Sequence, residues 1–122
     1  MSGATDPERW EVFRAKIPTA GGAEDHYVVV VSRTEIVRAS RYVHVIPIDS
    51  DDRTAWATRA AVVPLSVGRN PFLDHDSFAM CHWLLRIDKD RIAKGRFVGR
   101  LSEIDQRPVR LAIELVLGTR ES

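Results

Sequence analysis

The sequence predicts an α+β fold that is mainly β: a small, strongly bent sheet or barrel of about five to seven short strands, with one helix at the C-terminus. Two observations carry this prediction. Short runs rich in β-branched residues recur along the chain at irregular spacing, bounded by clusters of glycine, proline and charged residues. Only the last apolar run has the spacing of an amphipathic helix, and such a helix can pack its apolar side against the sheet.

The clearest strand is Tyr27–Ser32, with the sequence YVVVVS. β-branched side chains lose freedom in a helix and fit a pleated surface, so a short unbroken run of them is typical of a strand buried on both faces. Alternation in Trp10–Ile17 predicts an earlier strand. Between the two, Pro18–His26 is expected to be a flexible loop, in which Gly21 and Gly22 let the chain turn back as a hairpin.

Further strands are expected at four later runs. Pro47, inside the first of them, indicates an edge position or the end of a strand, because proline cannot donate to the ladder. The third run is expected to be one continuous strand. A single helical turn is expected before the fourth, at Asp88–Ile92. The four runs are Tyr42–Ile48, Ala60–Leu65, Ser77–Leu85 and Gly95–Leu101.

The C-terminal helix is expected to begin after Ser102. The Ser102 hydroxyl is predicted to cap the free backbone N–H groups, and Glu103 and Asp105 to place negative charge at the positive end of the helix dipole. Apolar residues then follow at helical spacing, and Gly118 is placed to end the helix.

The chain has 122 residues, which is enough for one domain with a single core. We expect residues 1–8 to be a flexible leader, residues 9–118 the domain and residues 119–122 a tail. The net charge of +1 excludes a whole-molecule field for nucleic acid, so any anion site must come from local clusters of arginine. One cysteine excludes an intramolecular disulfide, and the lack of a signal peptide or a transmembrane run favours a cytoplasmic protein.

The order of four short patterns resembles the MazF/PemK family of bacterial toxin endoribonucleases, over roughly residues 9–118. That family typically has Arg-Pro before its valine strand, Thr or Ser at the end of its third strand and an Asp-Gln pair in a later strand. The matching patterns here are the first-hairpin loop Ile17–Glu24, the valine strand Tyr27–Ser32, the third strand Val45–Ser50, and Ser77–Ser102 leading into the last helix.

The resemblance implies a CcdB/MazF-type SH3-like barrel and a homodimer. It also implies growth inhibition by cleavage of single-stranded RNA, with no metal ion or other cofactor. The implied protein partner is an antitoxin, a segment of which occupies the RNA groove. Because the same fold includes gyrase poisons, the fold alone does not fix the target.

Several family positions carry different residues in this chain. His26 stands where the family has its arginine, which is a general acid/base and a charge partner for the transition state. Asp49 stands in place of the catalytic Thr or Ser, with Ser50 next to it. His82 and Trp83 replace the Asp-Gln pair.

Metal-free RNA cleavage needs a base, an acid and positive charge near the phosphate. His26 is expected to transfer a proton, because imidazole in general changes protonation near neutral pH. The second titratable group would be Glu24, or Asp49 if the two loops meet. Ser50 would donate a hydrogen bond to a phosphoryl oxygen, and Arg53 would hold the phosphate.

Trp56 lies among aspartate, arginine and threonine and is the best candidate for stacking on an RNA base. Trp10 and Trp83 are expected to pack in the core or at an interface instead. The spacing of the histidines matches no metal site, and Cys81 is expected to be a small buried apolar residue. Two alternatives to RNA cleavage stay open: a catalytically silent module that binds RNA or a protein partner in the same groove, and a CcdB-like gyrase poison.

Overall fold

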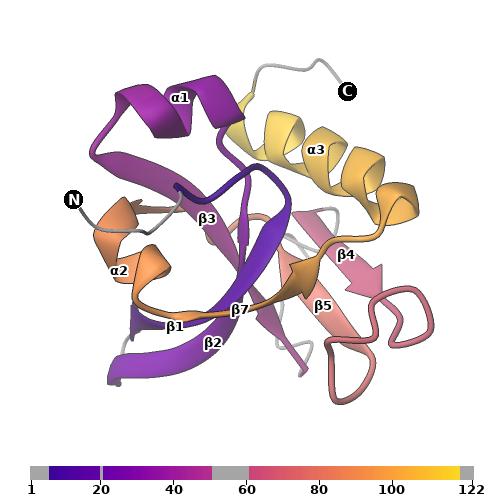
Figure 1. Cartoon of the computed structure of the whole chain (residues 1–122). Helices are drawn as coiled ribbons and strands as arrows, with labels where there is room; N and C mark the ends of the chain where they lie inside the picture. The colour runs from indigo at the N-terminus through magenta and orange to yellow at the C-terminus, as the bar shows by residue number, and fades with distance from the viewer. Residues whose placement is uncertain (1–5, 20, 51–60, 119–122) are drawn as a thin grey trace.

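The computed structural model describes residues 6–19, 21–50 and 61–118 (Figure 1). These ranges form a mainly antiparallel sheet of seven strands with a helix at the C-terminal end, so the predicted α+β, mainly β class is confirmed. None of the helices in these ranges is long and apolar enough to cross a membrane. The elements are β1 (Glu11–Thr19), β2 (Gly22–Val30), α1 (Thr34–Ala39), β3 (Tyr42–Asp49), β4 (Val62–Leu65), β5 (Ser77–Met80), β6 (Leu85–Asp88), α2 (Lys89–Ala93), β7 (Arg96–Arg100) and α3 (Glu103–Leu117).

The strands run in the order β4-β5-β3-β2-β1-β7, and β6 pairs with β3 beside β5. Every pairing among the described strands is antiparallel. Helix α3 packs near β4 and α2 packs on β1, so the two helices contact different parts of the sheet (Figure 1).

The valine strand is buried on both faces, as predicted. Val28 and Val30 belong to one core cluster, and Val29 and Val31 belong to a second cluster that includes residues of α3. All four side chains are at most 8% exposed. Because side chains alternate along a strand, β2 is the element that separates and supports both clusters.

The first hairpin forms where it was expected, but the predicted loop Pro18–His26 is wrong. Strand β1 continues to Thr19 and β2 already begins at Gly22, so most of the expected loop is paired strand. The sequence from Gly22 to His26 has little intrinsic preference for a strand, and pairing with β1 overrides that preference. Gly22 has a φ of 111°, which glycine adopts without strain at the turn.

Two further expectations about strands are corrected. Pro47 is not on an edge strand: it pairs with Val28 of β2, and on the other side of β3 it lies between the β6 pairing, which ends at Val45, and the β5 pairing, which begins at Ile48. The expected single strand Ser77–Leu85 is divided by a turn into β5 and β6. Both parts pair with β3: β5 pairs with the end of β3, and β6 pairs with its first half.

The start of α3 is fixed by a buried carboxylate rather than by the predicted serine cap. The Ser102 side chain makes no capping hydrogen bond; its backbone N–H donates to Asn70 Oδ1 at 2.9 Å. The Asn70 amide in turn donates to Asp105 Oδ2 at 2.8 Å, and Arg69 donates to the same carboxylate at 3.1 and 3.3 Å. Asn70 and Asp105 are both buried, so this cluster fastens the loop between β4 and β5 to α3.

Trp10 has a positive φ of 73°, which is rare for a bulky residue. Its N–H donates to the Val30 carbonyl at 2.7 Å, and its own carbonyl accepts from the Leu101 N–H at 2.9 Å. The indole is 8% exposed and lies in the same core cluster as Val29. These contacts hold Trp10 in its strained conformation. The indole packs in the core, as expected from the sequence.

Replacing Asp105 by alanine is expected to lower the free energy of unfolding by about 2–3 kcal/mol, because it removes one of the two acceptors of the buried Asn70 amide and leaves Arg69 without its ion pair. The loss of stability is smaller than for a fully buried ion pair, because the Arg69 side chain is 42% exposed and water screens its charge. Urea denaturation measures the change. The matched control, Glu103→Ala, removes an exposed carboxylate from the same turn and is expected to change stability by less than about 0.5 kcal/mol. Equal losses in the two variants would contradict this account.

Candidate active site

A cavity of about 300 Å³ lies where the pairing of β2 with β3 ends. We call it the His26 cavity. It is lined by residues from the middle of β2, from the end of β3, from β1, and from the start of β5 and the loop before it. Its members that bear on chemistry are Arg14, His26, Tyr27, Asp49, Ser50 and His75. Three of the four predicted catalytic residues therefore line one cavity.

The side chain of the fourth, Glu24, lies against the His26 ring. The distance from Glu24 Oε2 to His26 Nε2 is 3.4 Å, and the two residues lie two positions apart on β2, so they share a face of the strand. The His26 side chain is only 16% exposed, and its ring meets the Trp83 ring edge-on at 5.7 Å between centroids. His26 is thus a shielded strand residue and not a solvated loop residue.

Asp49 lies on the same face as His26. Tyr27 pairs with Ile48 and Val28 with Pro47, so the same register places position 49 opposite position 26, one step beyond the last pair. Asp49 is half-buried and Ser50, which follows the strand, is exposed. From the sequence, Asp49 was expected to act with His26 only if the first hairpin and the end of the third strand meet. Residues of both segments line the His26 cavity.

Arg14 was not among the predicted site residues, but it supplies the arginine of this cavity. It pairs with Tyr27 across the hairpin, and its guanidinium lies 4.8 Å from the centre of the Tyr27 ring. The register places Arg14 and Tyr27 on the face opposite to His26. A sequence signal existed: alternation puts Arg14 on the otherwise apolar face of Trp10 and Val12.

His75 is the second residue that sequence reasoning missed at this site. It lies in the loop before β5, where the Ser77 hydroxyl donates to its carbonyl at 2.9 Å and the Val67 N–H donates to the Asp76 carboxylate at 2.9 Å. No local pattern indicates this placement. It follows from the pairing of Asp49 with Phe78, which brings the start of β5 beside the end of β3.

Two predicted RNA-binding residues, Arg53 and Trp56, lie outside the described residues, and their roles stay predictions. Trp83 packs against the core cluster around Val28 and against His26, as the packing interpretation expected. Within the described ranges, no group of three or more His, Cys, Asp or Glu side chains is placed to hold a metal ion.

Cys81 is fully buried at the turn between β5 and β6, close to α3. Its sulfur is 3.9 Å from the Val109 carbonyl oxygen. Burial raises the pKa of the Cys81 thiol to about 12, because the thiolate would lose its hydration. The thiol is therefore an inert packing group, which agrees with the prediction from the sequence.

The polar groups that line the His26 cavity are thus two imidazoles, three carboxylates, two serine hydroxyls, the Tyr27 phenol and one guanidinium, and Glu24 lies beside one of the imidazoles. Imidazole and carboxylate groups can exchange protons with a substrate, and a guanidinium can hold a phosphate through two parallel hydrogen bonds. These are the groups that acid/base chemistry on a phosphodiester uses.

Residues 8–117 match the model of the family described as PemK-like, MazF-like toxins of type II toxin-antitoxin systems. This match covers most of the chain, and the chain belongs to that family. The resemblance found in the sequence is therefore confirmed.

Solved structures are similar to this chain in fold. A mycobacterial endoribonuclease in complex with its cognate antitoxin has a TM-score of 0.74 at 18% identity, covering 95% of this chain and 99% of that one. The Mycobacterium tuberculosis toxin MazF-mt6 has 0.70 at 19%, covering 88% and 96%. MazE-MazF from Deinococcus radiodurans has 0.71 at 12%, covering 93% and 98%. No curated protein sequence matches the chain.

Cys81 is expected to resist alkylation in the folded protein. Iodoacetamide reacts with the thiolate, so a pKa near 12 predicts labelling at about pH 8 that is at least about a thousandfold slower than for an ordinary exposed thiol. Mass spectrometry of intact protein measures the rate, and the urea-unfolded chain is the control. Rapid labelling of the folded chain would show that the turn at Cys81 is open.

Proposed function

We propose that this chain is an endoribonuclease that cleaves single-stranded RNA without a metal ion, at the His26 cavity. Membership of the toxin family supports the reaction class. The observation that carries the proposal is the Glu24–His26 pair beside a cavity that also contains Asp49, Ser50 and an arginine. The arginine is Arg14, on β1, rather than the Arg53 favoured from the sequence.

In this mechanism the ribose 2′-oxygen attacks the adjacent phosphorus while a base takes the 2′-proton. The bond from phosphorus to the 5′-oxygen breaks, and an acid protonates that oxygen as it leaves. The products are a 2′,3′-cyclic phosphate and a 5′-hydroxyl end. Arg14 and the Ser50 hydroxyl would stabilise the charge that develops on the phosphoryl oxygens.

His26 is assigned one of the two proton transfers. Glu24, 3.4 Å from its Nε2, would fix the orientation of the ring. The other proton transfer falls to Asp49 or His75, which both line the cavity. Two variants, Asp49→Asn and His75→Ala, separate these candidates because each removes one titratable group only.

One observation favours the silent alternative, a module that binds RNA or a protein partner without cleavage. The strand register puts Arg14 and His26 on opposite faces of the hairpin, so a phosphate must lie at the end of the β2–β3 pairing to reach both side chains. A groove that binds without cleaving would tolerate this separation, whereas catalysis would not tolerate a misplaced group.

The decisive experiment is cleavage of long single-stranded RNA by the purified chain in EDTA. The His26→Ala variant is expected to lose about 10²- to 10⁴-fold in rate, the range of general acid–base catalysis. The 5′-ends of the products should accept phosphate from a polynucleotide kinase without prior phosphatase treatment, since the mechanism leaves 5′-hydroxyls.

The matched control is His44→Ala, which removes an exposed histidine of β3 that is not part of the cavity lining. It should cleave like the natural chain. Cleavage that survives in His26→Ala would move the chemistry away from this residue. RNA left intact by the natural chain would favour the silent binding module.

We also propose that the chain works with an antitoxin and as a homodimer. Among the similar structures, one is an endoribonuclease in complex with its cognate antitoxin, and another is MazE with MazF. For the second copy of this chain, α3 offers an outward stripe at helical spacing, Ile104, Leu111 and Leu115, of which Ile104 is 70% exposed. The opposite side of α3 carries the buried Val109.

A Leu115→Glu substitution is expected to convert a dimer into a monomer, because it places a charge in the apolar contact without touching the folded core. Multi-angle light scattering during gel filtration measures the mass. Arg38→Glu, at an exposed position of α1 and therefore away from the stripe on α3, serves as the control. A natural chain that elutes as a monomer at all concentrations would exclude the dimer.

A further inference from the structure

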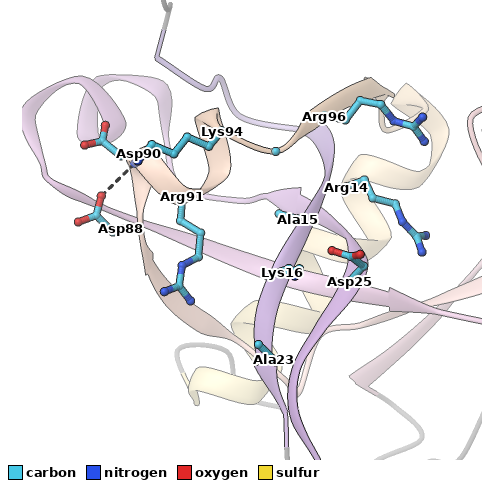
Figure 2. A pocket seen from close by; sticks show the side chains of 11 residues that line it. Arg14, Ala15, Lys16, Ala23, Asp25, Asp88, Asp90, Arg91, Lys94 and Arg96 are labelled. Carbon is cyan, nitrogen blue, oxygen red and sulfur yellow. Dashed lines mark hydrogen bonds between the residues drawn. The ribbon is translucent and has the colours of Figure 1, made fainter.

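A second and larger cavity, of about 800 Å³, lies between the first hairpin and α2. We call it the basic cavity. Five of its lining residues are basic and come from β1, from α2 and from the segment that follows α2: Arg14, Lys16, Arg91, Lys94 and Arg96. Figure 2 shows Arg91 and Lys94 extending from the α2 side and Arg14 from β1. The proposed cleavage reaction does not use four of these five residues.

The five basic side chains are available to a ligand. None of them forms an ion pair with another described residue, and Lys16, Arg91, Lys94 and Arg96 are exposed. Because the whole chain carries a net charge of only +1, five basic side chains that have no carboxylate partner in the described part of the chain are a local concentration of positive charge.

The cavity also contains three aspartates, but one of them already has its partners. Asp88 accepts from the Asp90 N–H at 2.9 Å and from Arg41 Nε at 2.9 Å, and Arg41 is not part of the lining. The hydrogen bond from the Asp90 N–H has the larger effect and the one from Arg41 the smaller, and together they hold the pKa of Asp88 below its usual range. The charge of Asp88 is thus balanced from outside, and the basic residues outnumber the two remaining aspartates, Asp25 and Asp90.

The basic cavity and the His26 cavity share two lining residues. Arg14 and Asp25 line both, and Figure 2 shows them side by side on the two strands of the hairpin. A chain that leaves the His26 cavity past Arg14 therefore meets Lys16 and then the α2 side chains. A linear polyanion fits this arrangement, because its charges repeat along its length.

The width of the basic cavity is fixed at Gly95. A Cβ at this position would lie 2.6 Å from the Arg14 carbonyl oxygen and 3.1 Å from the Ala15 Cβ, so the segment after α2 can lie against β1 only with glycine there. The close approach holds the basic residues of α2 at a set distance from Arg14 and Lys16. The cavity is thus preformed.

We infer that the basic cavity binds the phosphates of single-stranded RNA that flanks the cleavage site. The inference rests on the proposed nuclease function. It assigns Lys16, Arg91, Lys94 and Arg96 to nucleotides beyond the scissile phosphate. These contacts are to the backbone and carry no sequence information, so they increase the affinity for long substrates of any sequence.

The test is the binding of fluorescent 2′-O-methyl RNA of mixed sequence, about 12 nucleotides long, measured by anisotropy against salt concentration. This RNA lacks the attacking hydroxyl, so binding is read without cleavage. The double variant Arg91→Gln/Lys94→Gln should bind about 25-fold more weakly at about 0.1 M salt, and the slope of log K against log salt should fall by about 1.4, since each phosphate contact contributes about 0.7 for single strands. An oligonucleotide of about four nucleotides should bind both proteins alike.

The matched control, Arg38→Gln/Arg107→Gln, removes the same charge from two exposed residues of α1 and α3 that do not line the cavity. Equal effects of the two double variants, or no binding by the natural chain at low salt, would overturn the inference. So would a poly-glutamate peptide whose binding depends on Arg91 and Lys94 while RNA binding does not, because the occupant would then be an acidic protein segment. The nuclease proposal is judged separately, by the His26→Ala cleavage assay.

Discussion

The burial of β2 on both faces is the constraint on which the rest of the structure depends. Val28 and Val30 need cover from one side and Val29 and Val31 from the other, so the chain must place packing elements on each face. Toward its start the same strand loses this cover, and His26 lies where burial gives way to exposed residues. The candidate site therefore lies at the edge of the core, where a polar group keeps a rigid support and gains access to a ligand.

The order and type of most strands, and the C-terminal helix, could be predicted because each depends on a local pattern. The boundaries could not. Residues from Gly22 to His26 are poor strand formers, and the partner strand alone orders them. The division of Ser77–Leu85 into β5 and β6 depends on β3, which pairs with both parts. The start of α3 is likewise held by a residue distant in sequence, because Asn70 bonds both to the buried Asp105 and to the Ser102 N–H.

The site divides in the same way. Glu24 was expected as a titratable partner of His26 because the two are close in sequence, but the strand that places them on one face was not expected. The position of Asp49 beside His26 depends on the register in which β2 pairs with β3, and this register could not be read from either strand alone. Arg14 and His75 come from other segments, and only the pairing of β1 with β2 and of β5 with β3 brings them to the same cavity. Residue type indicates what chemistry is available, and tertiary pairing decides which groups take part.

The backbone of Trp10 connects the two ends of the domain. Its N–H bonds to Val30 and its carbonyl to Leu101, so a residue just before β1 is joined both to the central strand and to the segment that leads into α3. Release of β1 would remove one of the hydrogen bonds that hold the segment before the last helix, in addition to the Asn70–Asp105 cluster. We therefore expect the amide hydrogens of β1 and of the start of α3 to be protected from exchange with solvent to a similar degree.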